Sequence, residues 1–435
     1  MENLDGSLEP INPIKNWDKT VGFILFLVLI IGAPFVLPSN IHYLRLLMGL
    51  ALGYILSRSY TGFAGSVNRA YKTGSTKLMR TMMFMFLITA IANVTFLMFA
   101  KNLTAYDLSI NPINIGLILG GLFFGFGMAF SSCCATGVMT DLATDLPRAG
   151  VTLIFFCFGV FIGFPLQATQ SWIKGSVLTS KTGAKFSQGV YMPDLFKWDG
   201  LDGYFGSVIL TAFLVGLVIY LSYSYEKKRR QKSTYVGVPS ERVQDNPKDE
   251  DIANFTMSSK STYNILFKKP WTLKQGAVGM TIVFILMMGL TKSGWGASTP
   301  YGFWFGKVLN SFGVSATSLA NFTHQPAEVY SGPLLANGVT VQDLGIFLGA
   351  IIFIFTAGLF KETMHSVSTL NMKNASLFAL GGFTMGFGTR LSNGCNVGAL
   401  YTPIAQFSVS GWIFLAALVL GGIIGNKLSK TIYGY

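Results

Sequence analysis

Long apolar runs separated by short polar stretches make up most of the chain. A helix needs about 20 apolar residues to cross a bilayer, and about 17 suffice when its ends are wet. The runs at 43–57 and 375–389 are short and rich in glycine, so whether each spans or re-enters stays open. The pattern predicts an all-α polytopic membrane protein with about nine or ten transmembrane helices, drawn from 20–37, 43–57, 81–100, 114–130, 151–168, 204–224, 275–290, 344–360, 375–389 and 411–426.

Composition supports a membrane protein. Only 12% of the 435 residues are charged and 51% are hydrophobic, whereas soluble domains carry roughly 25% charged residues. This excludes a disordered chain, a disulfide scaffold and nearly all soluble enzymes. The net charge of +13 comes from basic residues in short loops, which indicates contact with a lipid bilayer rather than with nucleic acid.

The basic loops predict an orientation. Residues 58–80 carry five basic residues and no acid, a second basic cluster occupies 226–232, and Lys427 and Lys430 follow the last run. The positive-inside rule places all three in the cytoplasm, together with both termini. The long stretches 169–203 and 291–343 then lie outside as loops.

An internal repeat divides the chain. GGLFFGFGMAFSSCCATG at 120–137 matches GGFTMGFGTRLSNGCNVG at 381–398 without a gap, at a separation of 261 residues. The repeats extend over 120–150 and 381–411. We therefore expect an N-terminal transmembrane half (1–225), a charged cytoplasmic linker (226–263) and a C-terminal transmembrane half (264–435).

The two halves are predicted to have opposite topology. Two spans separate the basic 58–80 loop from the first cysteine segment, whereas one span separates the 361–374 loop from the second. One extra crossing inverts the repeat. Inverted, pseudo-symmetric halves with short broken helices that meet near the midplane are typical of secondary transporters.

Each repeat also predicts a binding device. A glycine-rich helix ends at residue types that cap helices, and a cysteine follows at the start of a second run. A thiol at a helix N-terminus lies beside free backbone N–H groups, which bind anions. The candidate path residues are Ser131, Ser132, Cys134, Gly137, Ser392, Asn393, Cys395 and Gly398.

Other chemistry-bearing residues have simpler interpretations. Cys157 lies in an apolar run and Cys133 has Gly394 at its matching position, so both fit as small apolar fillers. No C-x-x-C or histidine pair indicates a metal, and we expect no cofactor. No buried acidic residue stands out as a proton or sodium site.

Arg390 is the remaining candidate. It lies five residues before Cys395 at the end of an apolar run. Charged residues at such positions often mark ion or substrate paths. The alternative is an arginine that extends to the lipid headgroups.

GFGTRLSNGCNVGALYTPIAQFSVSGW at 386–412 closely resembles the signature of the YeeE/YedE membrane proteins, and GFGMAFSSCCATG at 125–137 resembles a second copy of it. The family is implicated in thiosulfate uptake, and some members are associated with selenium. The resemblance implies an hourglass-shaped helical fold in the inner (plasma) membrane of a prokaryote. It also implies that the matching cysteines, Cys134 and Cys395, pass thiosulfate along a narrow path by S–H···S contacts.

The sequence departs from that family at one position. Members often carry a further cysteine before a phenylalanine, and here Gly62 precedes Phe63. Whether Cys133 substitutes for it stays open. The family often works with a soluble sulfur-carrier protein of the TusA type, which implies a separate cytoplasmic partner.

Three functions compete. The first is a transporter, not an enzyme, that takes up a small sulfur or selenium oxyanion, most simply thiosulfate. The second is a membrane thiol-disulfide oxidoreductase that uses Cys133 and Cys134 or the repeat pair. The third is a general inorganic anion channel in which the cysteines only pack. The preferred anion, the coupling ion and the oligomeric state are left open by the sequence.

Overall fold

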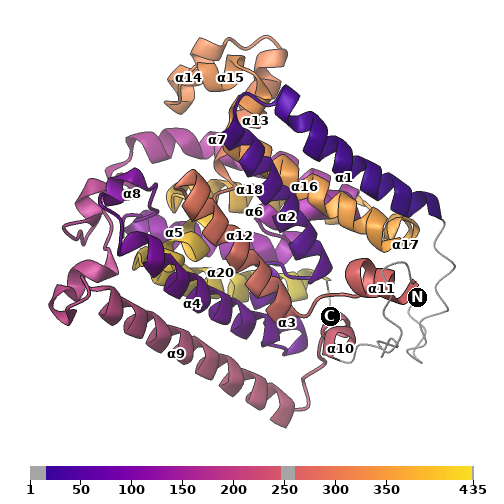
Figure 1. Ribbon diagram of the computed structural model, residues 1–435, viewed down its shortest axis with the longest axis horizontal. Helices are drawn as coiled ribbons and strands as arrows, with labels where there is room; N and C mark the ends of the chain where they lie inside the picture. Colours follow the sequence, from indigo (N-terminus) through magenta and orange to yellow (C-terminus); the bar gives the residue numbers. More distant parts are fainter. Residues whose placement is uncertain (1–15, 246–259, 434–435) are drawn as a thin grey trace.

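The computed structural model describes residues 16–245 and 260–433, and these form a helical membrane protein (Figure 1). Within these ranges there is no β-sheet, only two isolated bridges, Asp107 with Ser293 and Tyr191 with Ser408. The predicted all-α class is confirmed. Both chain ends and the acidic centre of the predicted linker lie outside the described residues.

The first part of the chain alternates long helices with short ones. Its elements are α1 (Asn16–Val36), α2 (Asn40–Arg58), α3 (Gly65–Thr73), α4 (Lys77–Leu97), η1 (Leu103–Ala105), α5 (Ile115–Ser131), α6 (Ala135–Thr144), α7 (Leu146–Thr169), α8 (Ser171–Lys174), η2 (Gly183–Lys185), η3 (Met192–Leu195), η4 (Lys197–Asp199) and α9 (Tyr204–Gln231).

The second part of the chain also alternates long helices with short ones. Its elements are α10 (Pro239–Asp245), α11 (Lys260–Tyr263), η6 (Asn264–Lys268), α12 (Leu273–Thr291), α13 (Thr299–Ser311), α14 (Ala316–Thr323), α15 (Glu328–Ser331), η7 (Leu334–Ala336), α16 (Gly338–Ala357), α17 (Phe360–His365), α18 (Met372–Leu391), η8 (Asn396–Tyr401), α19 (Thr402–Ala405) and α20 (Ser410–Tyr433).

Eight spans among the described residues are long and apolar enough to cross a membrane, with α5 and α6 counted together. They account for eight of the ten predicted runs. The other two, 43–57 and 375–389, fall on α2 and α18, which have 19 and 20 residues but are more polar. Both are long enough to span, since a helix rises about 1.5 Å per residue.

The stretch 291–343 is more structured than the loop that the sequence predicts. It contains α13, α14 and α15, and α13 packs against α7. At 13 residues α13 is too short to register as a span. It nevertheless buries Tyr301 completely, so this helix belongs to the core.

Glycines allow the central helices to approach closely. α5 packs along α20, α18 packs along α7, and α5 and α18 also contact each other. A Cβ on Gly125 would lie 2.1 Å from the Leu418 carbonyl oxygen, and one on Gly386 would lie 2.2 Å from that of Phe156. These two glycines occupy the same place in the two repeats, so each is required by the contact that it makes.

The peripheral helices α1 and α9 lie on opposite sides of this core (Figure 1) and are mostly exposed, with apolar side chains that face outward. Glu226, near the C-terminal end of α9, links this helix to the start of α4. Its carboxylate accepts hydrogen bonds from Thr76 and pairs with Arg80 at 2.9 Å and Arg230 at 2.8 Å. The basic clusters at 58–80 and 226–232 therefore lie at one end of the molecule.

Candidate functional site

The first cysteine segment is a helix break between α5 and α6. α5 ends at Ser131, and Ser132 adopts a left-handed conformation with φ 57°. The chain then turns, and Cys134 becomes the N-cap of α6, where its Sγ accepts a hydrogen bond from the Gly137 N–H at 3.3 Å. The predicted thiol at a helix N-terminus is present here.

The second cysteine segment repeats this arrangement. α18 ends at Leu391, Asn393 has φ 57°, and Cys395 is the N-cap of η8, which continues into α19. Cys134 and Cys395 are free thiols, 1% and 0% exposed. The short broken helices at both cysteines are therefore as predicted.

Ser131 and Ser392 make the same pair of hydrogen bonds in the two segments. Ser131 Oγ donates to the carbonyl oxygens of Gly127 (3.1 Å) and Cys133 (3.4 Å). Ser392 Oγ donates to those of Gly388 (2.9 Å) and Gly394 (3.0 Å). Both hydroxyls thus stabilise the helix ends. Direct contact of these hydroxyls with a substrate stays a prediction.

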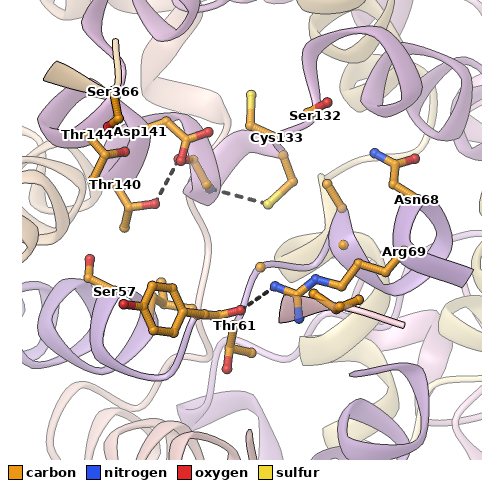
Figure 2. A pocket seen from close by; sticks show the side chains of 18 of the residues that line it. Ser57, Thr61, Asn68, Arg69, Ser132, Cys133, Thr140, Asp141, Thr144 and Ser366 are labelled. Atoms are coloured by element: carbon orange, nitrogen blue, oxygen red, sulfur yellow. Dashed lines mark hydrogen bonds between the residues drawn. The ribbon is translucent and has the colours of Figure 1, made fainter. Parts of the chain in front are cut away.

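A cavity of about 670 Å³, here the first cavity, opens beside the first segment. Figure 2 shows Cys133 and Asp141 on one wall and Ser57 and Thr61 on the facing wall, with Arg69 at the side. The predicted residues that line it are Gly62, Ser132, Cys133, Cys134 and Gly137.

The first cavity is lined by charged side chains of both signs. Arg69 and the exposed Lys72 line it. Arg69 donates to the Tyr60 carbonyl oxygen at 2.6 Å and pairs with Glu241 at 3.2 Å. Asp141 is held by Arg148 at 3.0 Å. Glu362 also lines the cavity. Arg69 is thus paired, and Lys72 is the cation of this lining that no carboxylate of the described residues pairs with.

A smaller cavity of about 250 Å³, here the second cavity, lies beside the second segment. Asn393, Gly394 and Gly398 line it, and they match Ser132, Cys133 and Gly137 of the first cavity in the repeat. Cys395 is buried behind this lining. Each cavity is therefore built against the corresponding cysteine segment.

The two cavities lie at opposite ends of the same two helices. Arg45 of α2 and Val339 of α16 line the second cavity, whereas Leu56 of α2 and Phe353 of α16 line the first. Fourteen residues separate Val339 from Phe353, which corresponds to about 21 Å of helix. The cysteine segments thus face cavities at the two ends of the helix bundle.

Arg390 does not extend to a headgroup region, because its side chain is 3% exposed and buried in protein. Its guanidinium donates to Ser298 Oγ at 3.2 Å and to Thr299 Oγ1 at 3.3 Å, and these two residues line the second cavity. It also donates to Gln167, which in turn donates to Asn393. No carboxylate of the described residues pairs with it.

Gly62 lines the first cavity, and a Cβ there would meet no atom within 4 Å. By contrast, a Cβ at Gly394 would lie 2.6 Å from the Gly398 carbonyl carbon. This crowding explains why Cys133 has no thiol counterpart in the second repeat.

Sequence reasoning missed several residues at the two cavities. Arg45, Ser293 and Gly294 line the second cavity, while Thr61 lines the first beside the predicted position Gly62. The same triplet of a hydroxyl residue, a glycine and an aromatic residue follows a helix at 61–63 and again at 293–295. The aromatic residues of the two triplets, Phe63 and Trp295, pack against each other with 6.1 Å between their ring centroids. This recurring triplet is visible in the sequence and could have identified both cavity-lining segments.

Comparisons with known proteins give one family. A family profile described as sulphur transport matches residues 58–424. The chain is 29% identical over 168 residues to the probable transporter YedE of Escherichia coli strain K12, covering 38% of this chain and 40% of that protein.

Two further relatives align over most of their length. The chain is 23% identical over 376 residues to the thiosulfate transporter TsuA of Escherichia coli strain K12, covering 86% of this chain and 91% of that protein. It is 22% identical over 384 residues to the thiosulfate transporter TsuA of Spirochaeta thermophila, covering 86% and 95%.

Proposed function

The chain belongs to the sulphur-transport family that its cysteine signature resembles, and on that premise we propose that it is a transporter that takes up thiosulfate across the inner membrane of a prokaryote. The observation that carries the proposal is the pair of cysteine-capped helix starts, each built against its own cavity. The names of two long-aligning relatives supply the substrate.

The anion enters at the second cavity. Arg45 lines it, and Arg390 contributes positive potential from behind Ser298 and Thr299. In a partly dehydrated site a unit charge at 4 Å contributes on the order of 4 kcal/mol before desolvation is subtracted. This potential offsets part of the hydration that thiosulfate loses.

The two thiols then receive the anion in turn. Cys395 is reached first and Cys134 second, and each thiol is a weak S–H donor placed beside the N–H groups of a helix start. No bond of the anion is broken in this transfer. The anion leaves through the first cavity past Arg69 and Lys72.

The two halves are proposed to be inverted relatives. The packing of α5 on α20 and of α18 on α7 supports this, because exchanging the repeat partners converts one pair into the other. We propose that the first cavity and both termini face the cytoplasm, because the positive-inside rule favours that side for the basic clusters. Reporters fused at positions 185 and 320 are expected outside, and one at position 240 inside.

A soluble sulfur carrier of the TusA type is the proposed acceptor at the cytoplasmic first cavity. Selenium oxyanions are a second candidate substrate, since they share the charge and size class of the sulfur anions. An inside-negative potential of about 100 mV opposes entry of a dianion by about 4.6 kcal/mol, at about 2.3 kcal/mol per charge. Uptake therefore needs either consumption of the anion inside or a co-transported cation.

Uptake of radiolabelled thiosulfate into proteoliposomes tests this proposal, with sulfite, selenite, chloride and nitrate as competitors. We expect saturable uptake that excess chloride or nitrate does not inhibit. Equal flux of chloride and thiosulfate would instead support an anion channel. Turnover of a thiol substrate without anion flux would support an oxidoreductase.

A further inference from the structure

Asp343 is a completely buried acid in the first part of α16. It lies on α16, is 0% exposed, and neither of its carboxyl oxygens has a hydrogen-bond partner among the described residues. In the sequence it follows Gln342 and falls in the predicted outside loop 291–343, just before the predicted run 344–360. An acid inside a membrane span is costly and is usually retained for a function.

The titratable groups around Asp343 come from four elements. Arg45 on α2, Tyr301 on α13, Cys157 on α7 and Cys395 before η8 all interact with it electrostatically. Of these, Arg45 is the one cation.

None of these groups neutralises the carboxyl by direct contact. Arg45 donates instead to Ser293 Oγ at 2.7 Å and Gln342 Oε1 at 3.3 Å. Tyr301 donates its hydroxyl to the Ala135 carbonyl oxygen at 2.7 Å. An ionised carboxylate buried without a partner is strongly unfavourable. In this conformation Asp343 therefore holds a proton.

Asp343 also lies between the two cavities. Val339, one helical turn before it on α16, lines the second cavity, and Phe353, ten residues after it, lines the first. The helix rise places the carboxyl about 6 Å along the axis from the Val339 level and about 15 Å from the Phe353 level. Its position is suited to exchange with each cavity in turn.

We propose that Asp343 is the binding site for a proton that is transported together with the anion. The proton reaches Asp343 from the second cavity and stays on it while the anion moves inward, and it leaves to the first cavity as the anion is released. The proton offsets one of the negative charges that move inward. The identity of the anion rests on the proposed function, whereas the proton site rests on the burial of Asp343.

Arg45 provides the link between the two ligands. It lines the second cavity and is the cation whose field favours ionised Asp343. An anion bound at Arg45 cancels that field, so anion binding favours protonation of Asp343. Because coupling between two binding sites is reciprocal, protonation of Asp343 strengthens anion binding to the same extent.

The experiment measures thiosulfate and proton movement together in sodium-free proteoliposomes that contain an internal pH dye, with the membrane potential clamped. For the wild type we expect internal acidification that begins with thiosulfate addition and is proportional to uptake. Asp343→Asn should lose the acidification, and Asp343→Glu should retain it. Asp202→Asn, which removes an exposed acid that lines neither cavity, should keep the acidification.

The outcomes separate the two proposals. Wild-type thiosulfate uptake without acidification, or acidification that persists in Asp343→Asn, overturns the proton site and leaves the proposed function standing. An Asp343→Asn protein that is inactive, beside an active and coupled Asp343→Glu protein, supports the site. If the wild type takes up no thiosulfate, the proposed function fails and the coupling falls with it.

Discussion

Ser132 and Asn393 adopt the same left-handed backbone conformation, each with φ 57°, at matching positions of two repeats 261 residues apart. Each residue begins the turn that leads from a glycine-rich helix into a cysteine-capped one. The two cysteine segments therefore share their conformation as well as their sequence.

This conformation predicts a stability difference at Ser132, whose side chain is exposed. The left-handed region costs a residue with a Cβ roughly 1–2 kcal/mol, and a β-branched side chain is the least tolerant. Ser132→Val should therefore lower the melting temperature in detergent, while Ser132→Gly should leave it unchanged or raise it. Equal melting temperatures for the two variants would contradict the role of this turn.

Helix packing predicts a severe effect at Gly125. An added methyl group would lie 2.1 Å from the Leu418 carbonyl oxygen, so Gly125→Ala must push α5 away from α20. Overpacking typically costs about 1–3 kcal/mol. We expect a lower melting temperature and a lower yield of folded protein. Gly216→Ala on α9, where a Cβ would meet nothing within 4 Å, is the control and should melt like the wild type.

The open space at Gly62 predicts that a thiol fits there. Gly62→Cys in a Cys133→Ala, Cys134→Ala background should fold normally and react with a charged thiol reagent applied to the first-cavity side. Gly394→Cys, which places a thiol at the position that matches Cys133, should fold poorly, because its Cβ would clash with the Gly398 backbone. An unreactive Gly62→Cys protein would show that the first cavity is not accessible to ions.

Arg390 should control affinity for the anion. Loss of its charge removes an interaction of about 1–3 kcal/mol, so Arg390→Gln should raise the half-saturating thiosulfate concentration roughly ten-fold or more. Arg390→Lys should retain part of the affinity, because the charge remains without the planar fork. Uptake is normalised to folded protein, since Arg390 is buried. An unchanged concentration dependence for Arg390→Gln would remove Arg390 from the path.

Much of the fold follows from hydrophobic length alone, because the spans on α4, α5, α7 and α16 are long and uniformly apolar. Cys134 and Cys395 could be identified because the repeat keeps them aligned. Tyr301 could not, since α13 is shorter than a span and its burial depends on packing against α7.

The polar residues at the centre were the hardest to predict. Asp343 lies beside Gln342 in the predicted loop 291–343, and its lack of a partner becomes visible only when the surrounding helices are in place. Arg45 and Ser293 meet across 248 positions of sequence. Gly62 and Gly294 are closer together in the sequence than the 261 residues that separate the two cysteine segments. An alignment of the chain with itself at one fixed offset therefore reveals the cysteine repeat but not the Gly62–Gly294 recurrence.

The most direct test of the account is thiosulfate uptake by Cys134→Ala and Cys395→Ala proteins reconstituted in proteoliposomes. A thiol-to-methyl change is small in volume, so both variants should insert and fold. We predict that each loses nearly all uptake while Cys157→Ala, which lines neither cavity, retains it. Wild-type rates in both Cys134→Ala and Cys395→Ala would contradict transfer of the anion by the two thiols.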